Sequence, residues 1–232
     1  MIRFRGYVKN KEDIGITLAL IPTTTDGVEI GSRHFPMSQS FMNGPNRGND
    51  VFIPMDWVIG DKAYVGQGWR MLMNSLSDGR AISLPALSTA SGQLVCRSVG
   101  AYAAVRKQFK VPIGKFEGIS EVLARIAVST YIMNAARGFT TSALDSGEDP
   151  SVASAILKYH MTERMREVIN DDMEILGGRG ISMGPNNFLD RPYEALPIAL
   201  TVYSANILAR HLILFSQRPY RRPHFLLTVL SS

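Results

Sequence analysis

The sequence predicts a mainly α protein in which a partial antiparallel β domain precedes a C-terminal helical bundle. Its 232 residues, of which 45% are hydrophobic, are enough to bury a substantial core. Up to about residue 64, short β-rich runs alternate with turn residues; beyond it, apolar residues recur at helical spacing. This change of period predicts a border between a domain of residues 1–64 and one of residues 65–232.

The first 64 residues carry short runs typical of antiparallel strands. The runs are ITLALIP (Ile16 to Pro22), VEIG, DVFIP (Asp50 to Pro54) and WVIG. Gly, Pro, Asn and Asp separate them at intervals of about ten residues, as in antiparallel sheets. A sheet this small leaves many edges exposed, so we interpret the region as part of a larger β domain.

Two long amphipathic helices are expected in the middle of the second region. The first carries apolar residues that end at a helix-terminating Gly147, namely Ile119, Leu123, Ile126, Met133 and Ala136. The second begins at Asp149 and Pro150, read as N-cap and first-turn proline. Its apolar stripe consists of Ile156 or Leu157, Met161, Met165, Val168, Met173 and Leu176. A short loop between two such helices favours antiparallel neighbours in a bundle.

Two further helices are expected, a long one within Gly68 to Phe109 and one from about Ala205 to Phe215. The four histidines show no spacing that would build a metal site, and we expect no metal. The acidic pair Asp171 and Asp172 is interpreted as a solvated helix face.

Charge and cysteine content narrow the class of protein. The net charge is +5, but basic residues cluster only at Arg218, Arg221 and Arg222. We interpret that cluster as a solvated tail or the rim of an anionic-ligand site, and we expect no nucleic-acid partner. Cys96 is the single cysteine, so it is interpreted as core filler, and a cytoplasmic location is favoured. No apolar run reaches the roughly 18 residues of a membrane span.

The stretch NDDMEILGGRGISMG, from Asn170 to Gly184, places several glycines behind a helical run. A dinucleotide fingerprint requires a strand before the glycines and a helix after them, whereas here a helix comes first. No Gly-Lys-Ser/Thr follows, which excludes a P-loop. Local pattern therefore favours the glycine-rich end of a helix, with a cofactor contact as the alternative.

Several stretches, taken in order, resemble the acyl-CoA dehydrogenase family, particularly its large bacterial branch that acts on long-chain acyl-CoA. Between Asp13 and Arg210 they are GITLALIP with GVEIG, GNDVFIPMDWVIG followed by GQGWRMLMNSLSDGR, RKQFKVPIGKFEGISEVLARIA, KYHMTE, EILGGRGI and PIALTVYSANILAR. The resemblance implies a middle β domain and a C-terminal four-helix bundle that hold FAD, and a homodimer or homotetramer.

The resemblance also implies roles for individual residues. Arg106 and Phe109 match residues that reach the FAD of a neighbouring subunit, where a guanidinium suits a pyrophosphate and an aromatic ring packs on the cofactor. Glu174, Gly177 and Gly178 match the family's Q-x-x-G-G, which contacts the adenosine half of FAD. Glu174 replaces a glutamine there, and its charge would weaken the binding of a diphosphate. Ala205 and Ile207 are also expected near the cofactor.

The residue that matches the catalytic base is where the chain departs from the family. Arg80 matches the arginine near the acyl thioester. Tyr203 stands where the family has the glutamate that removes the α-proton, and Gly79 stands at a second family position for that base. A phenol stays protonated at neutral pH and is a poor base, so we expect impaired catalysis.

Two functions remain open at this point. The first is an FAD-dependent acyl-CoA dehydrogenase that acts on fatty acyl-CoA in the first step of β-oxidation and passes electrons to an unidentified partner, in the cytoplasm or at the periphery of the inner membrane. The second is a non-catalytic fragment or oligomerising relic. The family's N-terminal domain would precede Asp13, so we expect a truncated or decayed chain.

Overall fold

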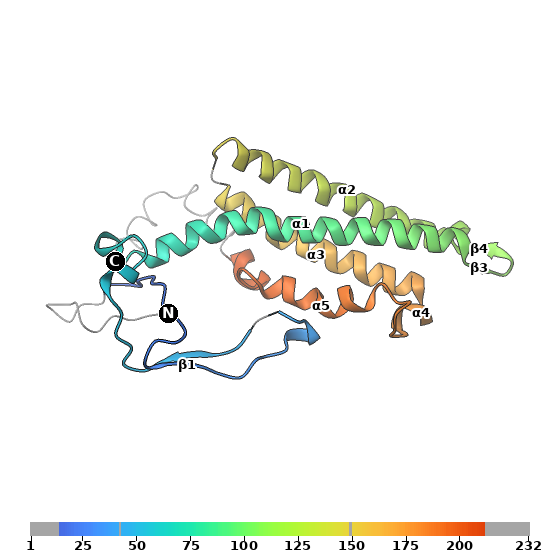
Figure 1. Cartoon of the computed structure of the whole chain (residues 1–232). Helices are drawn as coiled ribbons and strands as arrows, with labels where there is room; N and C mark the ends of the chain where they lie inside the picture. Colours follow the sequence, from blue (N-terminus) through green and yellow to red (C-terminus); the bar gives the residue numbers. More distant parts are fainter. Residues whose placement is uncertain (1–13, 42, 149, 212–232) are drawn as a thin grey trace. The chain divides into compact units, whose positions relative to one another are not determined.

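The computed structural model describes residues 14–41, 43–148 and 150–211 (Figure 1). The chain divides into two compact units between Leu76 and Ser77, inside the first long helix. The domain border that the sequence predicts between residues 64 and 65 is based on the change from strands to helices, and it stays a prediction. The basic cluster Arg218, Arg221 and Arg222 lies outside the described residues.

The first unit contains a small antiparallel ladder. Strand β1 (Val28–Ile30) pairs with β2 (Asn46–Gly48), so that Val28 lies opposite Gly48. Its 3-10 helices are η1 (Pro36–Ser38), η2 (Met55–Trp57) and η3 (Lys62–Tyr64). VEIG therefore forms the strand expected of it.

The other strands expected in this unit are reduced or absent. Ile16 and Ala19 form only isolated bridges, to Gln67 and Val58. The strand expected at Asp50 to Pro54 is wrong, since no strand forms there. Asp50 has φ 51°, which turns the chain out of the ladder, and Pro54 is the N-cap of η2.

The second unit is helical. Its elements are α1 (Gly68–Val105, which begins in the first unit), β3 (Lys107–Gln108), β4 (Val111–Pro112), η4 (Ile113–Lys115), α2 (Glu117–Asp145), α3 (Ser151–Leu176), α4 (Gly178–Ile181) and α5 (Asp190–Thr201). In Figure 1 the long helices of this unit run along one another. Residues 206–211 form a further helical turn, and the rest of the helix expected up to Phe215 lies outside the described residues.

One hydrophobic core joins α1, α2, α3 and α5. Its members include Val95 and Val99 of α1, Ile126 and Met133 of α2, and, from the other helices, Met161, Met165, Val168, Leu196 and Ala199. The apolar stripes read from the sequence therefore face the core, as an amphipathic bundle helix requires. The mainly α fold with a helical bundle is confirmed.

The expected glycine and proline lie at the ends of α2 and α3, but the proline stands one position earlier than expected. Gly147 follows the C-cap of α2 with φ 78°, a conformation that favours glycine. Pro150 is the N-cap of α3 and not its first helical residue, and Asp149 lies outside the described residues. Helix α5 was not expected from the sequence. In the part of the chain that the structure describes, no helix is both long and apolar enough to cross a membrane.

Candidate functional site

Tyr203 lies in the short segment that joins α5 to the helical turn at residues 206–211. Its side chain is half-buried against the core of the bundle. Tyr203 has φ 57° and Ser204 has φ 101°, so two consecutive side-chain-bearing residues adopt conformations that favour glycine. The backbone at this position is therefore held by its surroundings.

The ring of Tyr203 packs over Gly79 of α1. A Cβ atom on Gly79 would lie 3.1 Å from Cε1 of Tyr203 and 3.2 Å from its hydroxyl oxygen. The structure thus brings together the two positions at which the resemblance places a base, and neither carries a carboxylate.

Arg80 follows Gly79 in α1 and is half-buried. Burial lowers the pKa of Arg80 from its ordinary value, yet a guanidinium stays protonated at neutral pH. The hydroxyl of Ser204 is buried and has no hydrogen-bond partner among the described residues. This end of the bundle combines a positive charge, a phenol and a buried hydroxyl.

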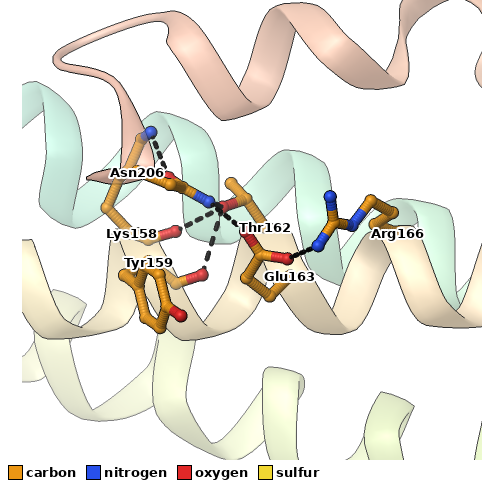
Figure 2. Close-up of polar contacts among 6 residues, drawn as sticks. All are labelled: Lys158, Tyr159, Thr162, Glu163, Arg166 and Asn206. Carbon is orange, nitrogen blue, oxygen red and sulfur yellow. Dashed lines mark hydrogen bonds and ion pairs between the residues drawn. The ribbon is translucent and has the colours of Figure 1, made fainter. Parts of the chain in front are cut away.

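A buried polar cluster holds the same segment and was not expected from the sequence (Figure 2). Lys158 of α3 is fully buried, and its ammonium group donates to the carbonyl oxygens of Leu200 and Ser204 and to Oδ1 of Asn206. Burial lowers the pKa of Lys158 to about 8; Glu163 raises it and Arg80 lowers it further. The sequence signal was a lysine at a position of α3 that faces the core, next to an apolar stripe.

Arg106 and Phe109 lie at the far end of α1. The turn between β3 and β4 contains Phe109 and Lys110, both with positive φ, as tight hairpin turns require. Arg106 is exposed, and the Phe109 side chain is 91% exposed. An aromatic ring so open to solvent is available to pack on a ligand or on another chain.

The glycine-rich stretch lies at the same end of the bundle. The Arg179 guanidinium lies 5.8 Å from the ring centroid of Tyr102, four residues before Arg106. Glu174, Gly177 and Gly178 are exposed. Next to them Arg179 and residues 182–187 line an open hollow of about 340 Å³.

Backbone conformation or close packing requires glycine at two of these positions. Gly177 ends α3 with φ 56°, and a Cβ on Gly180 would lie 2.8 Å from the sulfur of Met173. A Cβ on Gly178 would meet nothing within 4 Å. The interpretation as a helix end therefore explains Gly177 and Gly180, whereas Gly178 faces open space and is not explained by it.

The two groups of residues lie far apart within one chain. From Arg80 to Val105, α1 runs through 25 residues, about 38 Å at 1.5 Å per residue. Ala205 lies in the segment of Tyr203 and the 76% exposed Ile207 lies in the helical turn that follows it, so both belong to the end of Arg80. Arg106, Phe109, Glu174, Gly177 and Gly178 belong to the other end.

The interpretation of Asp171 and Asp172 as a solvated face is wrong for Asp172. Asp171 accepts a bidentate hydrogen bond from Arg125, at 2.7 and 3.0 Å. Asp172 is fully buried, and neither of its carboxylate oxygens has a partner among the described residues. Burial raises the pKa of Asp172 to about 7. Helical spacing was the signal that could have found this burial, since it places residues 168, 172 and 175 on one inward face.

The model of the acyl-CoA dehydrogenase C-terminal domain matches residues 66–199. Among curated proteins, the chain is 53% identical over 94 residues to protein HemX of Proteus mirabilis, covering 40% of this chain and 55% of that protein. It is 25% identical over 195 residues to the probable acyl-CoA dehydrogenase FadE10 of Mycobacterium tuberculosis (strain ATCC 25618 / H37Rv), covering 83% of this chain and 29% of the relative. The mouse very long-chain specific acyl-CoA dehydrogenase is 28% identical over 185 residues, covering 78% of this chain and 26% of the relative.

Solved structures share the fold. The acyl-CoA dehydrogenase from Geobacillus kaustophilus superimposes with a TM-score of 0.80 at 18% identity, covering 88% of this chain and 52% of that one. Butyryl-CoA dehydrogenase from Megasphaera elsdenii superimposes with a TM-score of 0.78 at 23% identity, covering 91% of this chain and 54% of that one. The chain thus spans between about a quarter and just over half of the length of these relatives. Because the family model matches more than half of the 232 residues, the chain belongs to the acyl-CoA dehydrogenase family.

Proposed function

We propose that this chain is the C-terminal, cofactor-binding and substrate-binding part of an FAD-dependent acyl-CoA dehydrogenase that acts on fatty acyl-CoA, with its proton-abstraction step impaired. The observation that carries the proposal is the packing of Tyr203 on Gly79, beside Arg80. Family membership supports the class of reaction, and this packing supports the impairment, because no carboxylate stands at either position of the base.

The proposed reaction passes the α-proton of an acyl thioester to a base at the position of Tyr203 while the β-hydrogen leaves as hydride. FAD, when bound, would supply the acceptor for that hydride. Arg80 and the backbone of residues 203–204 bind and orient the thioester. The phenol of Tyr203 replaces a carboxylate, and the loss of a general base usually slows a reaction about 100-fold to 10,000-fold.

The residues at the far end of the bundle fit a dinucleotide. Arg106 offers a planar pair of donors to a diphosphate, Phe109 offers an exposed ring to a flavin or adenine face, and the space above Gly178 is open. Glu174 adds a negative charge beside the proposed adenosine site, which lowers affinity for a diphosphate.

The separation of the two ends supports a homo-oligomer. Since about 38 Å of helix lies between Arg80 and Val105, a single FAD bridges both groups only if they belong to different chains. Exposed large apolar side chains of α2 support such an interface: Val128, Tyr131, Ile132 and Phe139. Each complete site then takes Arg80 and Tyr203 from one chain and Arg106 and Phe109 from another.

The alternative is a non-catalytic oligomerising module that keeps the bundle and its interface. Tyr203 at the position of the base favours it. The single cysteine, Cys96, supports a reducing compartment such as the cytoplasm for either function.

FAD retention and oligomeric state test the proposal. The protein is incubated with excess FAD, desalted, and measured by visible absorbance and analytical ultracentrifugation. Wild type should retain flavin as an oligomer, and Arg106→Ala and Phe109→Ala should retain less than the matched control Lys115→Ala, an exposed residue of η4. Oligomers that retain no flavin would favour the non-catalytic alternative.

A further inference from the structure

The segment that carries Tyr203 is fixed at both of its ends by one turn of α3. At its start, Nζ of Lys158 donates to the Leu200 carbonyl at 3.0 Å, inside the last turn of α5. Carbonyls there lack helical partners and carry the negative end of the helix dipole, so an ammonium group is favoured. Within the segment, Nζ also donates to the Ser204 carbonyl at 2.7 Å.

Asn206 ties the far end of the segment to the same turn. Its Oδ1 accepts from Nζ of Lys158 at 2.5 Å, and its Nδ2 donates to Oγ1 of Thr162 at 3.0 Å and to Oε1 of Glu163 at 2.8 Å (Figure 2). Glu163 is held in turn by an ion pair with Arg166. Lys158, Thr162 and Glu163 are spaced so that they project from neighbouring positions of α3.

This arrangement explains how the segment holds a costly backbone. Tyr203 and Ser204 both have positive φ, a conformation that is costly for residues other than glycine unless the surroundings impose it. An ammonium group has three donors, and the three of Lys158 are used by acceptors at residues 200, 204 and 206, on both sides of Tyr203. The charge makes these bonds stronger than neutral ones.

We propose that Lys158 is a positioning residue that fixes the backbone of residues 200–206, and with it the orientation of Tyr203 and of the amides beside it. The effect of this anchoring on the orientation of the acyl thioester rests on the proposed function. The anchoring itself does not, because every contact involved is made within this chain.

Hydrogen exchange of the full chain tests the anchoring without any ligand. In Lys158→Met, peptides that cover residues 200–206 should exchange about tenfold faster or more, while peptides around Ile126 and Met165 keep the wild-type rate. Lys115→Met serves as the matched control and should change neither region. If Lys158→Met does not fold, Asn206→Ala removes one of the three acceptors and should raise exchange in the same segment. Unchanged exchange in this segment, or a uniform increase over the molecule, would overturn the proposal.

A spectroscopic readout tests the consequence for the thioester. Infrared difference spectra of palmitoyl-CoA labelled with ¹³C at the thioester carbonyl should show a lowered stretching frequency in wild type and Lys115→Met, and the free frequency in Lys158→Met. A merely structural role would reduce the amount of bound ligand without moving the frequency, so an unmoved band in Lys158→Met contradicts positioning. A wild-type protein that binds no palmitoyl-CoA would overturn the proposed function, and hydrogen exchange would then decide the anchoring alone.

Discussion

The ring of Tyr203 occupies the space into which a side chain at Gly79 would extend. Cε1, Cζ and the hydroxyl oxygen of Tyr203 would lie 3.1 to 3.3 Å from a Cβ on Gly79, closer than ordinary van der Waals contact. The two positions therefore compete for the same space. A residue larger than glycine at 79 requires Tyr203 to move or to become smaller.

Gly79→Ala is expected to destabilise the protein by about 1 kcal/mol, because overpacking a filled site usually costs 1–3 kcal/mol while alanine favours the helix by up to 1 kcal/mol. In a Tyr203→Ala background the same change should become neutral or stabilising. Urea unfolding of the four proteins gives the coupling energy. Additive effects of the two substitutions would show that the residues do not compete for space.

Gly100→Ala is the matched control for this cycle. Gly100 lies in the same helix, and a Cβ there would meet nothing within 4 Å. The substitution should raise stability by about 0.5–1 kcal/mol, the usual gain from replacing glycine inside a helix.

Ser204→Gly should stabilise the folded protein. Ser204 has φ 101°, and its buried hydroxyl has no partner among the described residues, so glycine relieves backbone strain and removes an unsatisfied group. These gains outweigh the extra entropy of glycine in the unfolded chain by about 1 kcal/mol. Thermal unfolding measures the effect, and a lower midpoint would show that the Ser204 hydroxyl makes a contact that holds the segment.

Asp172→Asn should change how stability depends on pH. Burial raises the pKa of Asp172 from 3.8 to about 7 in the folded state. The folded protein thus binds the proton more tightly, and this contribution is present below pH 4 and is lost as the pH rises through about 7. At pH 8 the wild type holds a buried carboxylate, so Asp172→Asn should be more stable than wild type there.

Chemical denaturation at pH 5 and pH 8 checks this sign. The advantage of Asp172→Asn should shrink from pH 8 to pH 5, and an advantage that grows toward acid would contradict the burial of an ionisable carboxyl. Asp171→Asn breaks only the ion pair with the exposed Arg125 and is expected to cost under about 1 kcal/mol.

Periodicity predicts the parts of the fold that local chemistry determines. The stripe through Met161, Met165 and Val168 faces the core as expected, and Gly147 follows the end of α2. The Asp50 to Pro54 run failed because a strand needs a partner, and the turn at Asp50 leaves this run without one.

Helical spacing indicates inward positions for Lys158 and Asp172, but it does not show which groups surround them. Lys158 and Asp172 are charged residues in helical positions, and composition favours solvent for both. The burial of Lys158 depends on carbonyls from a distant part of the chain, those of Leu200 and Ser204. The packing of Tyr203 on Gly79 likewise joins residues more than 120 positions apart in the sequence.

Anaerobic reduction by palmitoyl-CoA is the most direct test of the claim that Tyr203 replaces the base. Wild type and Tyr203→Glu are loaded with FAD, desalted, and mixed with palmitoyl-CoA while the flavin absorbance is followed. Both should retain flavin, and Tyr203→Glu should bleach about 100-fold faster or more, as restoration of a general base implies. Wild type that bleaches as fast as Tyr203→Glu would contradict it.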